Sequence, residues 1–183
     1  MVRWAAGDQR AAAELIDRHT GPLRRFFRTK TNGDIEDLIQ QTLETCLHAR
    51  DRIPSAASFR AYMYSVARNV LFNHYRRRRR SLERFDPLET SVAALSPSPS
   101  QMVAQRERRG RLVAAMRELP LDLQVALELR YWEQLTGPEL ADVLEIPEGT
   151  VRSRLRRAMA QLRELLDEES YSERELSEAS GRG

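Results

Sequence analysis

Apolar side chains recur every three or four residues along most of the chain, the spacing that places them on one face of an α-helix. Long stretches that alternate apolar with polar residues do not occur, so strand signals are weak throughout. The pattern therefore predicts an all-α protein. Helical spacing covers about 8–19, 34–47, 58–80, 112–132, 137–144 and 148–166.

Several breaks separate these segments. Gly21-Pro22 is expected to end the first helix before a short segment through Phe26 and Phe27, because proline removes a backbone donor. The small residues from Pro54 to Ser58 predict a loop with Ser58 as the N-cap of the next helix. Leu119-Pro120 interrupts the helical pattern of the second half.

The periodicity fails between about Ser81 and Val103, where the run from Ser96 to Ser100 alternates serine with proline, as linkers do. We therefore expect two small helical domains joined by a flexible linker. Their expected bounds are 1–80 for the first domain, 81–105 for the linker, 106–167 for the second domain and 168–183 for an acidic tail that is disordered or weakly helical.

The last two predicted helices have the pattern of a helix-turn-helix. Ala141 is a small residue where two helices would cross, Ile146-Pro147 lie in a short turn, and the second helix has an apolar face beginning at Val151. The opposite face of this second helix is basic. The alternative is that the arginines only keep an exposed face soluble, although four arginines in six residues leave the charge of such a face poorly balanced. The candidate duplex-binding residues are Thr150, Arg152, Ser153, Arg154, Arg156 and Arg157.

Charge is distributed unevenly along the chain. The net charge is +3, but the segment from Asp167 to Gly183 contains six acids and two arginines, so the residues before it carry +7. Lys30 is the single lysine among 30 basic residues. Arginine suits bidentate contact with phosphates and guanines, although codon usage in a GC-rich genome would also favour it.

Other classes of function find little support. A single cysteine, Cys46, rules out an internal disulfide or a multi-cysteine zinc site within the chain. The pattern of a signal peptide is not visible in the sequence, and neither is an 18-residue apolar run, a glycine-rich phosphate loop or a metal-ligand cluster. We expect a cytoplasmic protein without membrane insertion, catalysis, metal or cofactor.

Both halves resemble one family. Leu119-Pro120, Leu129-Arg130-Tyr131, Leu140-Ala141 and the run from Ile146 to Leu155 resemble the fourth region of extracytoplasmic-function sigma factors, within the sigma-70 family. The run from Asp34 to Thr42 resembles their polymerase-docking helix in the second region. Ser58 to Tyr62 and Ala67-Arg68-Asn69 are similar to their promoter-melting segment.

The resemblance implies promoter DNA and core RNA polymerase as partners, and an anti-sigma factor is a further expected one. The first domain would bind the clamp of the largest polymerase subunit, and the second would bind the minus-thirty-five duplex and the flap of the second-largest subunit. Expected clamp-binding residues are Asp34, Asp37, Leu38 and Gln41, although Leu38 could simply be core. Expected minus-ten residues are Arg60, Tyr64, Arg68, Asn69, Asn73, Arg76 and Arg77.

Glu145 departs from the family, which usually has glycine in this turn, and it would cost roughly 1 kcal/mol if the position needs a positive φ. Two other functions stay open at this point. A helix-turn-helix repressor or activator would explain the second domain alone, and a nuclease using the acids from Asp34 to Asp37 would need a divalent metal. An extended linker of twenty-odd residues spans roughly 60 to 70 Å, enough for elements about 17 base pairs, or roughly 58 Å, apart.

Overall fold

The computed structural model describes residues 8–33, 35–49, 53, 56–78, 86–88, 90–95 and 108–180, and all its regular elements in these ranges are helices. The predicted all-α fold is thereby confirmed. An isolated bridge between Ser91 and Pro120 is the one β-type pairing among the described residues.

Helix α2 (Gln9–Arg28) begins at the Asp8 N-cap, whose side chain accepts hydrogen bonds from the backbone amides of Arg10 and Ala11. It runs straight through Pro22, so the predicted break at Gly21-Pro22 is wrong. The second half of α2 carries the buried side chains Leu23, Phe26 and Phe27. Their burial is worth several kcal/mol and outweighs the missing proline hydrogen bond, which costs about 3 kcal/mol.

Helices α3 (Ile35–His48) and α4 (Ala56–Arg78) pair with each other, and α3 also contacts α2. Helix α4 begins at Ala56, so Ser58 lies inside the helix and is not its N-cap. The core of this half is rich in aromatic side chains. Its fully or nearly fully buried members include Phe27, Phe59, Met63, Tyr64, Leu71, Phe72 and Tyr75.

Part of the predicted linker is attached to the second half. The short helix α5 (Val92–Leu95) contacts α7 (Arg108–Glu118), and Val92 is fully buried. The carbonyls of Thr90 and Pro87 accept hydrogen bonds from the first two backbone amides of α8, each at 2.9 Å. They replace a side-chain cap that Pro120 cannot provide. The reach of a fully extended linker does not apply to this attached part, and 96–107 lie outside the described residues.

Helix α8 (Leu121–Tyr131) is central to the second half, and every residue from Leu121 to Leu129 is buried. Leu123 and Leu127 join α7 and α10 in one apolar core, while Val125 and Leu129 belong to the core shared with the first half. The helix therefore has no solvent-facing side over this stretch.

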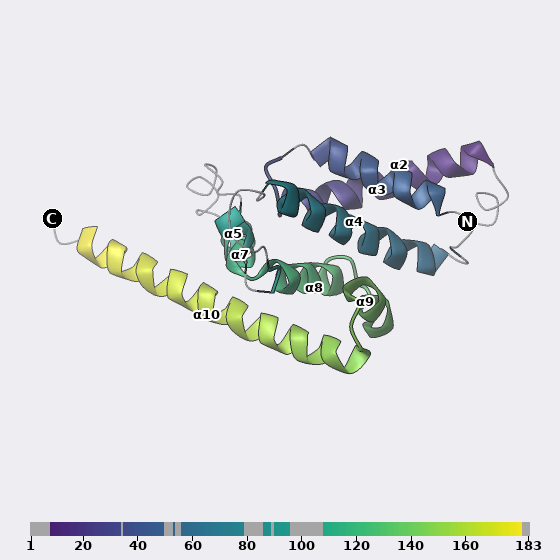
Figure 1. Ribbon diagram of the computed structural model, residues 1–183. Helices are drawn as coiled ribbons and strands as arrows, with labels where there is room; N and C mark the ends of the chain where they lie inside the picture. The colour runs from purple at the N-terminus through teal and green to yellow at the C-terminus, as the bar shows by residue number, and fades with distance from the viewer. Residues whose placement is uncertain are drawn as a thin grey trace.

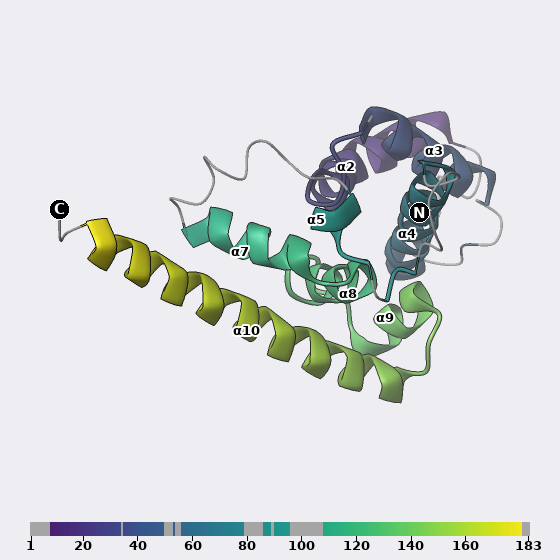
Figure 2. The same ribbon diagram turned by 60° about the vertical axis from the view of Figure 1, so that its left-hand side comes forward.

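The two halves lie against each other. Figure 1 shows α4 between the α2–α3 pair on one side and α8 with α9 (Gly137–Leu144) on the other, and α4 contacts α9 extensively. Helix α10 (Glu148–Ser180) follows the far edge of the second half, and its carboxy-terminal end projects beyond the other helices in both views (Figures 1 and 2). Helix α10 continues to Ser180, beyond the expected boundary at 167.

Candidate nucleic-acid interface

The turn between α9 and α10 has the geometry predicted for a helix-turn-helix. Thr136 caps α9 in a reciprocal capping box with Glu139. Glu145 ends α9 in the left-handed region at φ 56° and ψ 42°, so this position does have a positive φ. The Ile146 amide donates to the Ala141 carbonyl at 3.1 Å and closes the turn.

The first three turns of α10 separate an inner face from an outer one. Val151 is buried against the core of the helix-turn-helix and Ala158 against the core formed with α7 and α8, with exposed fractions of 1% and 0%. Predicted duplex-binding residues occupy the outer face, and the Ser153 hydroxyl donates to the Thr150 carbonyl at 2.9 Å. The exposed members of the set are Thr150, Arg152, Ser153, Arg156 and Arg157.

Arg154 lies apart from this face. Its side chain is 13% exposed, and its guanidinium donates to Oδ2 of Asp122, a carboxylate that is itself 3% exposed. A guanidinium held inside the protein by a buried carboxylate is not available to a base edge. The structure therefore places Arg154 in the packing between α10 and α8 and not on the outer face of α10.

Three of the predicted minus-ten residues lie against the second half of the chain. Arg68 donates from Nε to Oδ1 of Asp122 at 3.0 Å and keeps 11% of its side chain exposed. Arg60 donates to the Glu139 carboxylate at 3.2 Å and to the Glu133 carbonyl at 3.2 Å. Tyr64 is fully buried, and burial raises the pKa of its hydroxyl, as does the nearby Glu133 carboxylate. Arg68 and Tyr64 are therefore covered, whereas Arg60 keeps 36% of its side chain exposed.

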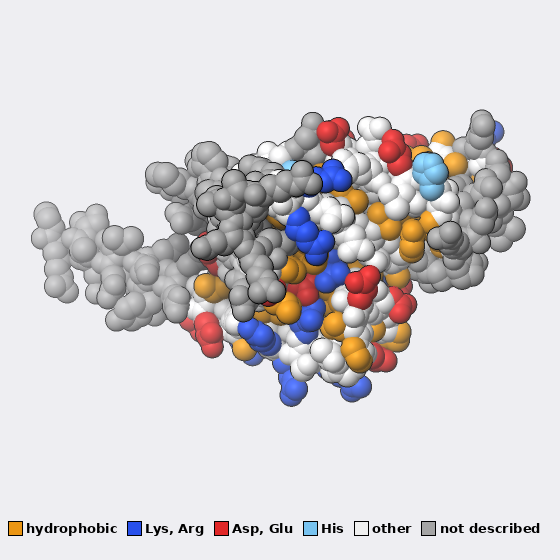
Figure 3. All heavy atoms as spheres, viewed as in Figure 1, with side chains coloured by type: hydrophobic (Ala, Val, Ile, Leu, Met, Phe, Trp, Pro, Cys, Tyr) orange, Lys and Arg blue, Asp and Glu red, His pale blue; other side chains and the backbone are white. Residues whose placement is uncertain are grey.

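The rest of that set lies on the open side of α4. Asn69, Asn73, Arg76 and Arg77 are exposed, and Arg76 donates to the Asn73 side-chain oxygen at 3.2 Å. Figure 3 shows Lys and Arg side chains running down the middle of this face, from the region of α4 toward α10. A polar surface with cations beside amides is suited to a nucleic-acid strand.

The polymerase-docking prediction falls on α3. Asp37 and Gln41 are exposed and lie one turn apart on α3. Leu38 is only 4% exposed and belongs to the core, which was the alternative to a clamp contact. Asp34 lies outside the described residues. A groove between α3 and α4 runs beside them, lined by Leu38, Gln41, Val70, Asn73, His74 and Arg77.

Sequence reasoning missed the acids that hold the arginines. Asp122 and Glu128 are each 2% exposed within α8, and Glu139 receives hydrogen bonds from Thr136 and Arg60. Burial acts to raise the pKa of Glu139, but these hydrogen bonds outweigh it and the pKa lies below the ordinary value. The sequence offered one signal for Asp122 and Glu128. Apolar residues lie on nearly all sides of α8, so the acids of this helix cannot all face solvent.

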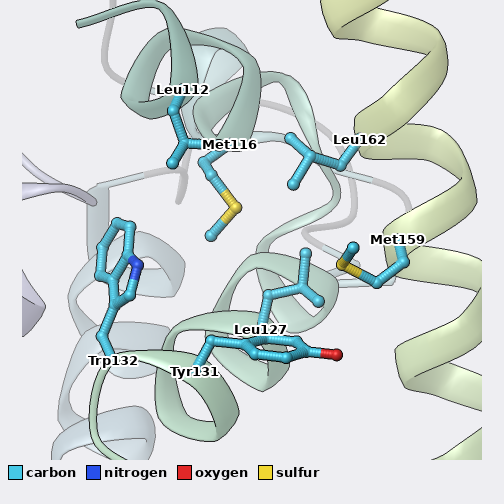
Figure 4. Close-up of a pocket in the computed structure, with 7 residues that line it drawn as sticks. All are labelled: Leu112, Met116, Leu127, Tyr131, Trp132, Met159 and Leu162. Atoms are coloured by element: carbon cyan, nitrogen blue, oxygen red, sulfur yellow. The ribbon is translucent and has the colours of Figure 1, made fainter. Parts of the chain in front are cut away.

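An apolar pocket opens on the second half, away from the recognition face. It lies between α7, α8 and α10 and has a cavity volume of about 160 Å³. Figure 4 shows the Trp132 ring at one side of the pocket and the side chains of Met116 and Met159 pointing into the pocket. Tyr131 and Trp132 are 52% and 44% exposed, unusual for side chains of this size. Its lining consists of Leu112, Met116, Leu127, Tyr131, Trp132, Met159 and Leu162.

The described residues contain no group of three His, Cys, Asp or Glu side chains arranged to hold a metal ion. No helix within the described ranges has both the length and the apolar character needed to cross a membrane.

Family models match both halves: the Sigma-70 region 2 model covers residues 15–81, and the Sigma-70, region 4 model covers 109–162. The chain is 31% identical over 175 residues to the RNA polymerase sigma factor CnrH of Cupriavidus metallidurans, covering 91% of this chain and 92% of CnrH. It is 29% identical over 161 residues to the ECF RNA polymerase sigma-E factor of Escherichia coli K12, covering 83% and 84%. CnrH in complex with the cytosolic domain of CnrY aligns with a TM-score of 0.66 and 26% identity, over 91% of this chain and 94% of that one.

Proposed function

The chain belongs to the sigma-70 family as an RNA polymerase sigma factor of the extracytoplasmic-function type, and from this premise we propose how its two halves share the work. Such a factor is a non-enzymatic polymerase subunit that binds core RNA polymerase and DNA. We assign docking and strand opening to residues 1–80 and duplex recognition to 106–167. On this assignment the protein acts in the cytoplasm.

The observation that carries the proposal is the exposed basic face at the start of α10. The amino-terminal part of a recognition helix enters the major groove, where arginine can pair with O6 and N7 of guanine. Arg152, Arg156 and Arg157 have their side chains in solvent and belong to a helix fixed by a capped helix-turn-helix. We assign them, with Thr150 and Ser153, to the minus-thirty-five element.

Docking on polymerase is assigned to two surfaces. On α3, the exposed Asp37 and Gln41 would contact the clamp of the largest subunit, together with Asp34. On the second half, the apolar pocket with its exposed Tyr131 and Trp132 suits the flap of the second-largest subunit, because a partner with an apolar side chain would cover the rings. Two separate docking surfaces would hold both halves on one enzyme.

Opening of the minus-ten element is assigned to α4. Asn69, Asn73, Arg76 and Arg77 present amides and cations to solvent, a combination that suits an unpaired strand. Capture of an extruded base would offset the few kcal/mol lost in unstacking. Arg60 and Arg68, which are paired with Glu139 and Asp122, would join this surface when the second half moves away. Tyr64 is fully buried and packs on Phe26 of the first half, so we do not assign it to the strand.

A regulatory partner is also proposed. CnrH, a relative with which this chain aligns over nearly its whole length, has been solved in complex with the cytosolic domain of CnrY. We infer that this chain is likewise bound by a protein of the anti-sigma class.

Polymerase docking is tested by co-purification of the full-length protein with core polymerase. Asp37→Arg combined with Gln41→Arg should abolish the association, because both positions are exposed and the change reverses the surface charge without touching the core. Asp17→Arg provides the control: it makes the same aspartate-to-arginine change at an exposed position of α2. Equal core binding by the double variant and the control would refute the assignment of α3.

Duplex recognition is tested by transcription from a promoter library with polymerase and each variant. Arg152→Ala or Arg157→Ala should cost about 1 to 3 kcal/mol at one base position of the upstream element if the contact is bidentate. Arg163→Ala is the matched control, because it removes an exposed arginine from α10 beyond the recognition face, and it should leave base preference unchanged. An equal loss of transcription from all promoter sequences would indicate phosphate contacts. If neither variant changes transcription from any promoter, the recognition face does not lie on α10.

A further inference from the structure

A short strap between the two halves, residues 86–88 and 90–95, is fastened to the second half through its backbone. The Thr90 carbonyl accepts a hydrogen bond from the Leu121 amide at 2.9 Å. The Pro87 carbonyl accepts one from the Asp122 amide, also at 2.9 Å. These are the first two amides of α8, which have no partner within the helix, so the strap acts as the cap of α8.

Val92 anchors the strap with its side chain. It is 0% exposed and belongs to the apolar core that both halves share, and its helix α5 contacts α7 (Figure 1). Asp86 closes a turn at the other end, where its carbonyl accepts from the Thr90 amide and its side chain from the Leu88 amide, each at 2.8 Å. The Leu88 side chain itself is 42% exposed. The strap is thus held by Val92 and by backbone hydrogen bonds.

The attached strap shortens the connection between the halves. Helix α4 ends at Arg78, and seven residues, 79–85, separate it from the strap. The eight Cα-to-Cα steps from Arg78 to Asp86 extend to at most about 29 Å. Promoter elements that are about 17 base pairs apart are separated by roughly 58 Å. The short connection therefore covers about half of the distance between the elements.

The second half supplies little of the missing distance, because the strap lies close to the recognition helix. Pro87 is bonded to the backbone of Asp122, and the Asp122 carboxylate accepts a hydrogen bond from Arg154 in α10. One aspartate and one arginine side chain thus separate the strap from α10. At the other end of the connection, Arg77 of the proposed minus-ten surface is the next-to-last residue of α4. Both ends of the short connection therefore lie beside the proposed DNA-binding residues.

We propose that the strap is a releasable part of the connection: it stays on the second half in the free protein and detaches when the two halves occupy both promoter elements. The proposal rests on the assignment of α4 to the minus-ten and of α10 to the minus-thirty-five element. Release leaves thirty steps between Arg78 and Arg108, about 100 Å when extended, which exceeds the required distance. The first amides of α8 then bond to water and Val92 becomes exposed. The free energy of release must therefore come from the contacts of both halves with DNA and polymerase.

Energy transfer between a dye on the strap and one on α10 reports release. The full-length protein carries dyes at Leu88→Cys and Arg163→Cys, two exposed positions. The native Cys46 is buried, and burial raises the pKa of its thiol to about 12, so it does not take up label at neutral pH. Transfer should fall at least about twofold from the free protein to its complex with core polymerase and promoter DNA, because the released strap is free to move away. A Glu118→Cys/Arg163→Cys pair, with both exposed positions in the second half, should keep its transfer.

Two matched insertions test whether the short connection causes release. Twenty-four Gly and Ser residues are placed either between 80 and 81, before the strap, or between 98 and 99, after it. The first insertion gives an attached strap 32 steps to α4, about as many as a released wild-type strap has, so the strap should stay attached and transfer should keep its free-protein value in the promoter complex. The second insertion does not lengthen that connection, and transfer should fall as in the protein without an insertion. Equal transfer in the two insertion variants would overturn the proposal, as would unchanged transfer in an active complex without an insertion.

Amide hydrogen exchange of the free protein measures how firmly the strap is attached. Val92→Ala removes two methyl groups from a buried position and should lower the protection of the Leu121 and Asp122 amides by about tenfold. The Val125 amide, further along α8, should keep its protection, which distinguishes a loosened strap from unfolding of the second half. Leu88→Ala is the matched control at an exposed position of the strap and should leave all three amides unchanged. Unchanged protection of Leu121 and Asp122 in folded Val92→Ala protein would contradict the attachment.

Failure of the strap and failure of the proposed function give different results. If the promoter complex is active while the strap stays attached, the strap proposal is wrong and the assignments of α4 and α10 stand. If Arg152→Ala and Arg157→Ala leave transcription from every promoter unchanged, the assignment of α10 fails and the distance argument fails with it.

Discussion

Replacing Asp122 by asparagine should weaken the protein more than any surface charge does. The two oxygens of Asp122 serve two arginines: Oδ1 accepts from Arg68 at 3.0 Å, and Oδ2 accepts from Arg154. Loss of the charge leaves both guanidinium groups at a neutral side chain in a site where the carboxylate is 3% exposed. Removing one member of a buried pair costs about 3 to 5 kcal/mol.

Two features of the site reduce that cost. Arg68 and Arg154 keep 11% and 13% of their side chains in solvent, and Arg68 also lies 4.5 Å from the centre of the Phe72 ring. A partly hydrated arginine with a cation–π contact loses less than a fully buried one. We therefore expect Asp122→Asn to cost about 2 to 4 kcal/mol, which lowers the melting temperature by about 5 to 15 °C in a chain of this size.

Thermal unfolding followed by circular dichroism at 222 nm measures this effect. Glu36→Gln is the control, because it removes the same charge from a pair whose side chains are 51% and 65% exposed, and its midpoint should match wild type. An Asp122→Asn midpoint equal to that of Glu36→Gln would refute the reasoning. It would mean that both arginines find water or other partners without loss.

Two further predictions concern single residues. Glu145→Gly should raise the stability by up to about 1 kcal/mol in urea unfolding, because φ is 56° at this position and glycine removes the left-handed strain; a destabilised variant would show that the Glu145 side chain matters more than its backbone. Cys46, whose thiol pKa burial raises to about 12, should resist iodoacetamide in the native protein at pH 8 and react faster as the pH rises toward that value, because only the thiolate reacts. Labelling of the native and urea-unfolded protein at equal rates would contradict this.

The helix-turn-helix was predictable because its signals are local. The small residue Ala141, the turn at Ile146-Pro147 and the apolar positions of the last helix lie within about twenty-five residues and fix one geometry. The helix bounds 137–144 and the start at Glu148 follow from them and are confirmed. The positive φ at Glu145 was foreseen as a condition, because glycine is usual at the end of such a helix.

Boundaries that depend on distant packing were not predictable in the same way. Pro22 is a local stop signal, but the aromatic core beyond it keeps the helix continuous. The start of α4 at Ala56 likewise precedes the Ser58 that local capping preferences favour. In both cases tertiary packing overrides a preference worth only a few kcal/mol.

The division of the arginines into exposed and paired ones also depends on distant residues. The residues next to Arg68 and Arg154 in the sequence are typical of exposed helices, and they do not predict that either arginine pairs with a buried acid. Asp122 lies 54 residues from Arg68 and 32 from Arg154, so the pairing depends on how the halves come together. Residue type therefore predicted a set of cations, and only the fold separates those that face solvent from those that do not.

The chemistry of the contact between the halves bears on how readily it opens. Separating an interface that is purely apolar exposes its buried surface to water, and this cost is the same whichever partner causes the separation. Buried ion pairs, in contrast, add little net stability and require one particular geometry. Charges that are paired across this contact can be hydrated or can meet phosphates when the halves separate, so separation does not leave them without partners. Arg60 and Arg68 would exchange Glu139 and Asp122 for the DNA backbone. A strand of nucleic acid would thus compete directly with the carboxylates of the second half for these two arginines.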